Sequence, residues 1–270
     1  MHLNHGCVSD LSRDPLPLRG RVALVTGAGR RQGIGCAVGR RLAAWGASVF
    51  LHHHEQVEGA DDVGAVVDEV RSQLVGGARV VEGGGDLAEP TGPDRLVTAA
   101  AAELGHLDVL VCNHARNGSD GPLSEVDADL LDRHWAVNTR STILLTRAFA
   151  AQHDGRGGGR VVLLTSGQAQ GPMPGEVAYA ASKGALAEVA LTLADELADA
   201  GITVNAVNPG PVRTGHVDDE ELRQLAPKFP FGRAGEPDDP ARLISWLATD
   251  EAVWITGQVL HSEGGFARWR

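Results

Sequence analysis

Short apolar runs alternate along the chain with longer segments rich in alanine and leucine. The runs 22–25 and 161–164 are apolar throughout, which is typical of strands buried on both faces of a parallel sheet. We expect strands over residues 21–26, 48–52, 79–82, 107–112, 160–165 and 202–207, and helices over 33–45, 57–74, 94–103, 123–152 and 177–200. This alternation predicts the α/β class: a single Rossmann-type, doubly wound parallel sheet of about seven strands with helices on both faces.

The length of the chain and the positions of its irregular segments predict one domain. The 270 residues suffice for one sizeable core. We expect a flexible N-terminal tail over residues 1–17, because it carries two prolines and no apolar segment of the kind found in signal peptides. Residues 18–270 would form the domain. Residues 211–237 are irregular and rich in proline, so we expect a mobile flap there that closes over a substrate.

Composition excludes several kinds of partner. A formal net charge of −11 argues against nucleic-acid binding, which needs clustered lysine and arginine. No apolar run approaches the roughly 20 residues that span a bilayer, so we expect no membrane contact. The 3 cysteines are scattered, which favours reduced thiols in the cytoplasm. The run His52-His53-His54 lacks the spacing of a metal site, because neighbours on a strand point to opposite faces, and we expect no metal.

A glycine-rich turn joins the first expected strand to the first expected helix. Glycines let a backbone turn tightly and approach a pyrophosphate, whose charge the helix N-terminus favours. The turn contains the candidate dinucleotide contacts Gly27, Gly29, Arg30, Arg31, Gly33, Ile34 and Gly35. The alternative is a turn required only for close packing of strand and helix.

The end of the second expected strand bears on which dinucleotide binds. An acidic residue there usually bonds the ribose 2′-hydroxyl of NAD, whereas a nearby arginine suits the 2′-phosphate of NADP. The chain has His53 and His54 at this place, and Glu55 lies one or two positions late. Together with Arg30 and Arg31, this favours NADP(H) and leaves NAD(H) open.

Tyr179 and Lys183 are four residues apart in an expected helix, and Tyr179 is thirteen residues after Ser166. Positions i and i+4 share a helix face, so the ammonium can lie near the phenol. A neighbouring positive charge lowers the pKa of a phenol, which predicts proton exchange beside a bound nucleotide.

These residues and their spacing resemble the short-chain dehydrogenase/reductase family over about residues 18–266. The most specific element is the set Asn138, Ser166, Tyr179 and Lys183, which stands in the family's order. The resemblance implies that Tyr179 exchanges a proton with the carbonyl oxygen and that Ser166 hydrogen-bonds the same oxygen. It also implies that Lys183 lowers the pKa of Tyr179 and bonds the nicotinamide ribose, and that Asn138 holds a water leading from Lys183 to solvent.

The resemblance further implies cofactor contacts at the ends of later strands. Asp86 and Leu87 would meet the adenine, and Asn113 and Ala115 would flank the adenosine ribose. The segment after the sixth strand would hold the nicotinamide carboxamide through Pro209, Gly210, Val212 and Thr214. Taken singly, Asp86 could instead cap a turn, and Asn113 could satisfy strand-end amides.

The chain departs from the family pattern at two places in the expected cleft. Five residues separate Gly27 from Gly33 where the family commonly has three, so contacts within the turn cannot be assigned by counting. The sequence after the fourth strand places His114 and Arg116 near the cofactor. With His216 they are candidate substrate contacts, and the alternative for the two histidines is an exposed loop position.

We therefore expect an NAD(P)-dependent oxidoreductase that interconverts a ketone and a secondary alcohol as a small-molecule substrate. Segments 230–237 and 255–258 resemble 3-oxoacyl-acyl-carrier-protein reductases. The alternatives are a relative acting on an imine or enone, and a non-catalytic dinucleotide-sensing protein, which would be expected to lose Tyr179 or Lys183. Resemblance also implies a homotetramer or homodimer, in which Trp269 could pack between subunits.

Overall fold

A single parallel sheet organises the chain in the computed structural model, which describes residues 14–54, 62–117, 120–215 and 219–269. The strand order is β3-β2-β1-β4-β5-β6-β7. The strands are β1 (Val22–Val25), β2 (Ser48–His53), β3 (Val80–Gly84), β4 (Val109–Cys112), β5 (Gly159–Leu164), β6 (Ile202–Asn208) and β7 (Val259–His261). The order reverses between β1 and β4, and in such sheets ligands bind at the carboxyl ends beside that point. The predicted fold class is confirmed.

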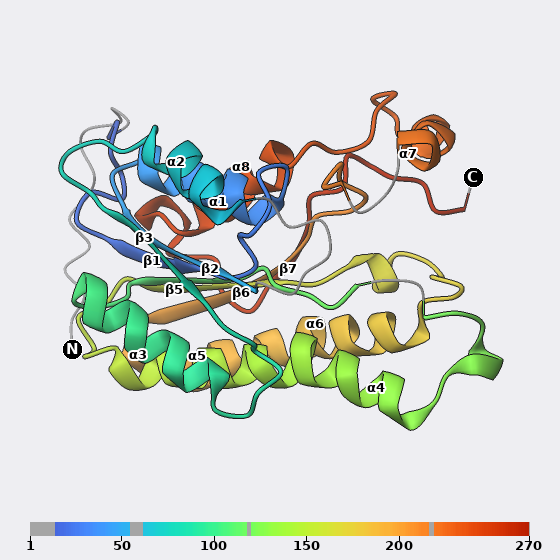
Figure 1. Ribbon diagram of the computed structural model, residues 1–270, viewed down its shortest axis with the longest axis horizontal. Helices are drawn as coiled ribbons and strands as arrows, with labels where there is room; N and C mark the ends of the chain where they lie inside the picture. Colours follow the sequence, from blue (N-terminus) through green and yellow to red (C-terminus); the bar gives the residue numbers. More distant parts are fainter. Residues whose placement is uncertain (1–13, 55–61, 118–119, 216–218, 270) are drawn as a thin grey trace.

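Helices cover both faces of the sheet (Figure 1). One face carries α1 (Ile34–Ala44), α2 (Val63–Arg71) and α8 (Asp238–Leu247), and the other carries α3 (Gly92–Leu104), α5 (Ser141–Gln152) and α6 (Val177–Leu197). Two further helices lie toward the carboxyl ends of the strands: α4 (Ala128–His134) and α7 (Asp219–Leu225). Single turns of 3₁₀-helix occupy Leu123–Glu125, Gly167–Ala169, Ala198–Ala200, Ala226–Lys228 and Asp250–Ala252.

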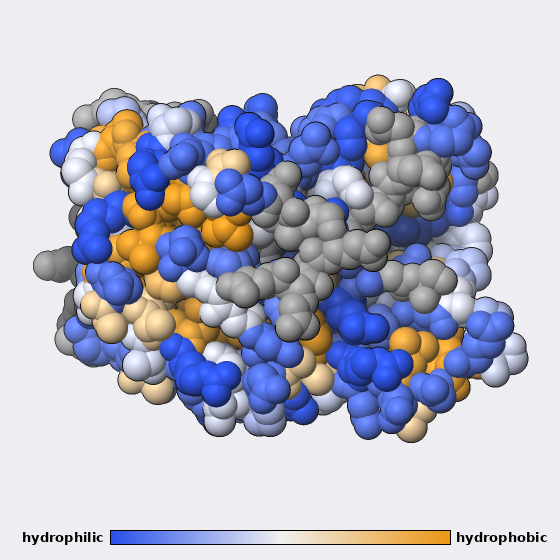
Figure 2. Space-filling view, in the orientation of Figure 1, coloured by the Kyte–Doolittle hydropathy of each residue, from blue (hydrophilic) through white to orange (hydrophobic). Residues whose placement is uncertain are grey.

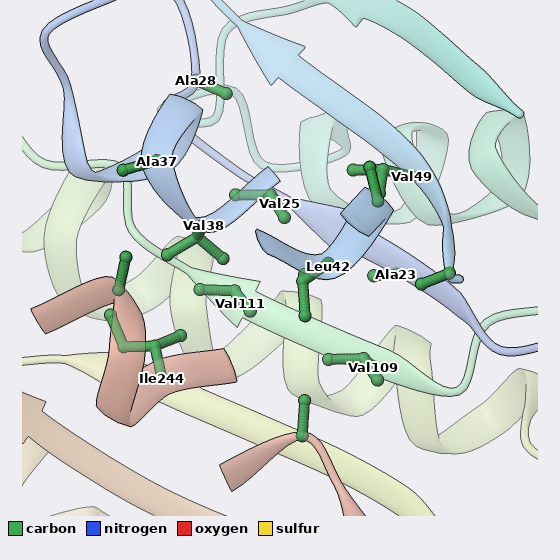
Figure 3. Packing of buried hydrophobic residues seen from close by; sticks show 14 of the residues in the cluster. Ala23, Val25, Ala28, Ala37, Val38, Leu42, Val49, Val109, Val111 and Ile244 are labelled. Carbon is green, nitrogen blue, oxygen red and sulfur yellow. The ribbon is translucent and has the colours of Figure 1, made fainter. Parts of the chain in front are cut away.

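Each face of the sheet has its own hydrophobic core. Figure 3 shows Val25 and Val111 of the sheet against Val38 and Leu42 of α1, with Ile244 of α8 beside them. Complete burial of one such side chain contributes about 1.5–3 kcal/mol. The strands are buried on both faces, which explains their continuous apolar sequences.

The predicted helix over 123–152 is wrong as a single element. Asp127 is extended and accepts a hydrogen bond from the Leu130 N–H at 2.7 Å, so α4 has its own start. A π-helical turn, Trp135–Arg140, then separates α4 from α5. The hydrophobic periodicity did not predict this interruption, because a π turn adds one residue without a proline or glycine to mark it. Helix α8 and strand β7 had no predicted range.

The ends of the flap, residues 211–237, are joined to each other. A parallel bridge pairs Val212 with Gly235, and the N–H of Arg213 donates to the Gly235 carbonyl at 2.8 Å. Between them, Leu222 and Phe229 are buried together with Ala234. The expected mobility of the flap stays a prediction.

The visible surface is largely hydrophilic, with hydrophobic patches over the α2 side and near α4 (Figure 2). By length and composition alone, the helical segment Val177–Ala200 could cross a membrane. In this fold the segment is mostly α6, which packs on β5 and β6 and buries Lys183. About 33% of its apolar window is buried in this chain, and Leu191 is among its exposed side chains.

Candidate active site

Tyr179 and Ser166 meet at the carboxyl end of the sheet. Ser166 follows β5 and caps the 3₁₀ turn Gly167–Ala169, while Tyr179 lies in the first turns of α6. Burial raises the pKa of Tyr179 to about 12; the nearby Ser166 hydroxyl opposes that rise, and the carboxylates of Glu176 and Asp120 add to it. The phenol is therefore protonated at neutral pH and can act as an acid.

Lys183 does not have the predicted effect on Tyr179 in this structure. Its Nζ donates to the carbonyl oxygen of Leu164 at 2.8 Å, and Lys183 is not among the groups that shift the phenol's pKa. Burial lowers the pKa of Lys183 to about 8. Burial also raises the pKa of the Cys112 thiol, to about 12. The buried Cys112 is therefore a small core residue with a protonated thiol.

Asn138 lies in the π-helical turn and is fully buried. Its Oδ1 accepts from the Arg116 N–H at 2.7 Å, and its Nδ2 donates to the Arg116 carbonyl at 3.0 Å and to Oγ of Ser182 at 2.9 Å. The side chain thus ties the loop after β4 to α6. The water that Asn138 was expected to hold stays a prediction.

A cleft of about 2470 Å³ opens along the carboxyl ends of the strands and contains most of the predicted site. The predicted residues that line it are Gly27, Gly29, Arg30, Gly33, Ile34, His54, Asp86, Leu87, Asn113, His114, Ala115, Arg116, Ser166, Tyr179, Lys183, Pro209, Gly210, Val212 and Thr214. Four others, Arg31, Gly35, His53 and Asn138, are not in its lining. His216 lies outside the described residues, as do Glu55 and the tail through residue 13.

The glycine-rich turn fits a dinucleotide phosphate. Gly33 is the N-cap of α1 with no side-chain cap, and the first turn of α1 has no acidic residue. A Cβ at Gly35 would lie 2.8 Å from Nδ2 of Asn113, and one at Gly27 would lie 2.7 Å from Cα of His114. Helix amides without a side-chain cap beside a crowded glycine turn form a favourable place for an anion.

Asn113 closes that turn from the neighbouring strand. Its Nδ2 donates to the carbonyls of Thr26 and Gly27 at 3.0 and 2.9 Å. Asp86 similarly accepts from the Ala88 N–H at 2.8 Å. Both residues therefore shape their loops as well as lining the cleft, so the structural roles that the sequence left open are present here.

The side chains of Arg31 and His114 do not point where the sequence predicted. Arg31 points to α2, where its Nε lies 2.9 Å from Oε2 of Glu69. Both ring nitrogens of His114 have protein partners: Nδ1 lies 2.7 Å from Oγ1 of Thr26, and Nε2 lies 2.7 Å from Oγ of Ser141. Burial holds the pKa of His114 well below its ordinary value, so the ring is neutral and belongs to the framework.

The histidines at the end of β2 point to different partners. Nε2 of His52 lies 3.0 Å from the Gly85 carbonyl, and the Gly27 N–H donates to its Nδ1 at 3.3 Å. His53 instead reaches Glu82 on β3, with Nε2 2.6 Å from Oε2. His52 and His54 line the cleft, whereas His53 does not. Of the two predicted cofactor contacts, His53 and His54, the geometry therefore supports His54.

Sequence reasoning missed two bracing arginines. Arg140 donates through its Nη2 to the Ala88 carbonyl, beside the expected adenine position. Nη2 of Arg268 donates a hydrogen bond to Oε2 of Glu263 at 2.9 Å. The same side chain packs against Gly167 and Gly171, where a Cβ would collide with it. Both line the cleft. Their signal was weak because each is a lone arginine outside any motif.

Comparisons with known proteins agree with the geometry. The family model described as enoyl-(acyl carrier protein) reductase matches residues 27–267. An uncharacterized oxidoreductase of Bacillus subtilis, YjdA, is 43% identical, covering 92% of this chain and 97% of its own. An NADPH-dependent aldehyde reductase-like protein, chloroplastic, of Arabidopsis thaliana is 34% identical, covering 96% and 98%. A short-chain dehydrogenase of Burkholderia cenocepacia, solved with NADP, is 34% identical with a TM-score of 0.83, covering 92% and 98%.

The chain belongs to the short-chain dehydrogenase/reductase family. It is accordingly an NAD(P)-dependent oxidoreductase, as its sequence predicted.

Proposed function

We propose that the protein is an NADP(H)-dependent carbonyl reductase in which Tyr179 protonates the oxygen of a ketone or aldehyde. The observation that carries the proposal is that Ser166 lies near the Tyr179 phenol within the cleft that the glycine-rich turn also lines. The cofactor supplies the hydride when bound. Ser166 and Tyr179 hold the substrate oxygen between two donors, which stabilises the charge that develops there.

Lys183 and Asn138 hold the surroundings of Ser166 and Tyr179 in place. The buried ammonium of Lys183 is held by Leu164 and can bond a ribose hydroxyl at the floor of the cleft. Asn138 fixes the backbone of Arg116, which lines the substrate side. In this proposal, Arg116 contacts the substrate.

The preference for NADP(H) rests on the residues around the end of β2. His54 and Arg30 line the cleft there, while the carboxylate of Glu82 is engaged by His53. A positive or neutral lining favours a 2′-phosphate over a 2′-hydroxyl that needs an acid. The named NADPH dependence of the Arabidopsis relative and the NADP complex of the Burkholderia protein support the same choice.

A paired measurement tests the proposal. NADPH and NADH are titrated by fluorescence, and NADPH consumption is then followed with a β-ketoester, an aldehyde and an enone. We expect tighter NADPH binding, turnover of a carbonyl compound, and loss of about 10²–10⁴-fold in kcat for Tyr179→Phe with cofactor binding retained. Turnover of the enone alone would favour the enoyl chemistry in the matching family model's description. Cofactor binding without any turnover would favour a sensor.

We further propose a cytoplasmic homotetramer or homodimer. Trp254 and Trp269 are 90% and 78% exposed in one chain, which is high for side chains of their size. Light scattering tests the assembly, and a monodisperse monomer would contradict it.

A further inference from the structure

A buried carboxylate that no sequence motif marked touches the catalytic helix. Oδ2 of Asp120 accepts a hydrogen bond from the backbone N–H of Tyr179 at 2.7 Å. The Asp120 N–H in turn donates to the Gly175 carbonyl at 3.1 Å. Glu176 is the N-cap of α6 by position but makes no side-chain cap bond. The cap is therefore supplied by a residue 59 positions earlier, on the loop after β4.

Asp120 has a second buried partner. Nε2 of His134, in α4, lies 3.1 Å from its Oδ1, and the two side chains are only 3% and 1% exposed. Nδ1 of His134 lies 3.0 Å from the Leu130 carbonyl, which can only accept, so Nδ1 carries a proton. The imidazole edge thus lies beside the buried carboxylate, although Nε2 and Oδ1 do not form a hydrogen bond.

The pair thus links three parts of the site. The loop that carries Asp120 also carries Arg116, which Asn138 fixes. Helix α4 leads into the π-helical turn that places Asn138. Helix α6 presents Tyr179. A cap bond at the Tyr179 amide fixes the start of α6, and a negative charge there suits the helix dipole.

We propose that Asp120 and His134 are positioning residues for Tyr179: together they cap the catalytic helix at its amide, fix the place of its phenol, and keep a buried carboxylate near it. This rests on the proposed reductase function. The groups that face the phenol are Ser166 after β5, Glu176 at the start of α6 and Asp120 from the loop. Lys183, one turn further along α6, is bonded to Leu164.

The chain allows a direct test because Tyr179 is its only tyrosine. Isotope-labelled tyrosine gives one backbone amide signal and one ring signal by NMR, both from Tyr179. Both signals are recorded in the NADP-bound protein as pH is varied, together with amide exchange, kcat, KM and the Kd for NADPH. The variants are Asp120→Ala, Asp120→Asn and His134→Gln. The control is Asp62→Asn, which alters the cap of α2 on the opposite face of the sheet.

We expect Asp120→Ala to speed exchange of the Tyr179 amide by at least about tenfold, since the amide loses its acceptor. It should lower kcat by about ten- to a hundredfold, because a small misplacement of a catalytic group has that cost, and leave the NADPH Kd unchanged. Asp120→Asn keeps an acceptor but removes the charge. Its amide should stay protected, while the phenol titration and the alkaline limb of the kcat profile move to lower pH. His134→Gln should leave the amide protected, because Asp120 keeps its hydrogen bond to the Tyr179 N–H.

The proposal is overturned if the Tyr179 amide of Asp120→Ala exchanges as in the wild type, or if the phenol of Asp120→Asn titrates as in the wild type. Should Asp120→Ala not fold, Asp120→Asn alone decides through the ring signal. A wild-type protein that reduces no carbonyl compound refutes the proposed function, whereas the two NMR signals still decide the role of Asp120 and His134.

Discussion

Nζ of Lys183 donates to the carbonyl oxygen of Leu164, over 2.8 Å, so the site's ammonium is anchored to the end of β5 rather than to the phenol of Tyr179. Lys183 is 2% exposed, and this burial lowers its pKa from 10.5 to about 8. At neutral pH the folded protein therefore buries the charged ammonium of Lys183, which water solvates better in the unfolded chain. This lowers the free energy of unfolding.

Lys183→Met should stabilise the fold while removing activity. The depressed pKa corresponds to about 3 kcal/mol of lost stability below the folded pKa, and the lost bond to Leu164 offsets about 1 kcal/mol. We expect a gain of about 2 kcal/mol in the free energy of unfolding at neutral pH. Between pH 8 and 10.5 the unfolded wild type binds the proton that the folded form has released, so wild-type stability rises with pH and the gain shrinks.

Urea denaturation at neutral and alkaline pH measures this difference, with Lys228→Met at a half-buried position as the control. A loss of stability for Lys183→Met at neutral pH would contradict the assignment of Lys183 as a destabilising cation.

Gly35→Ala should weaken dinucleotide binding by about tenfold or more. The new Cβ would lie 2.8 Å from both Nδ2 of Asn113 and the Gly27 carbonyl, which forces the phosphate turn to move. Gly64→Ala, in α2, is the matched control, because its Cβ would make only an ordinary 3.5 Å contact with Asp62. The control should keep the wild-type Kd and gain up to about 1 kcal/mol of stability. Equal NADPH affinities for the two variants, by fluorescence titration, would argue against a phosphate site at this turn.

Arg30→Ala and Arg31→Ala should differ, although the arginines are neighbours. Arg30 lines the cleft, whereas Arg31 is paired with Glu69 outside it. We expect Arg30→Ala to weaken NADPH binding by about tenfold, as for one lost charge-assisted contact, with little effect on NADH. Arg31→Ala should change neither. Calorimetric titration of both cofactors checks this, and a larger effect at Arg31 would reverse the assignment.

Asn138→Ala should destabilise the protein by about 2–3 kcal/mol, because it removes the three hydrogen bonds by which a fully buried side chain ties the backbone of Arg116 to Ser182. That is a drop in Tm of roughly 4–12 °C for a chain of this size. Calorimetry measures the drop, and Gln224→Ala, at an exposed position on α7, serves as the reference. A Tm within about 1 °C of the wild type would show that Asn138 does not brace the loop.

Much of the fold was visible in the sequence because the strands are buried on both faces. Continuous apolar runs such as Val22–Val25 mark such strands, and the glycines between them mark the turns. The short strand β7 was missed, since its Val259 and Leu260 are only partly buried and give no comparable run.

Site residues were predicted where a sequence motif fixes their position. They were missed where the role of a side chain depends on a partner that is distant in the sequence. Tyr179 and Lys183 follow from helical spacing. The direction of Arg31 depends on where α2 packs, and the burial of His114 depends on Thr26 and Ser141 lying opposite it. Asp120 precedes α4 and His134 is its last residue, so the two meet only in the folded chain.

The extra residue in Trp135–Arg140 has a consequence for how this enzyme tolerates change in length. It lets Asn138 face α6 while Leu145 and Phe149, further along, still face the sheet. Deleting one residue there would turn the rest of the helix by about 100° and carry both side chains out of the core. Residues 154–156, by contrast, could lose or gain a residue with little harm, because they are exposed at the surface.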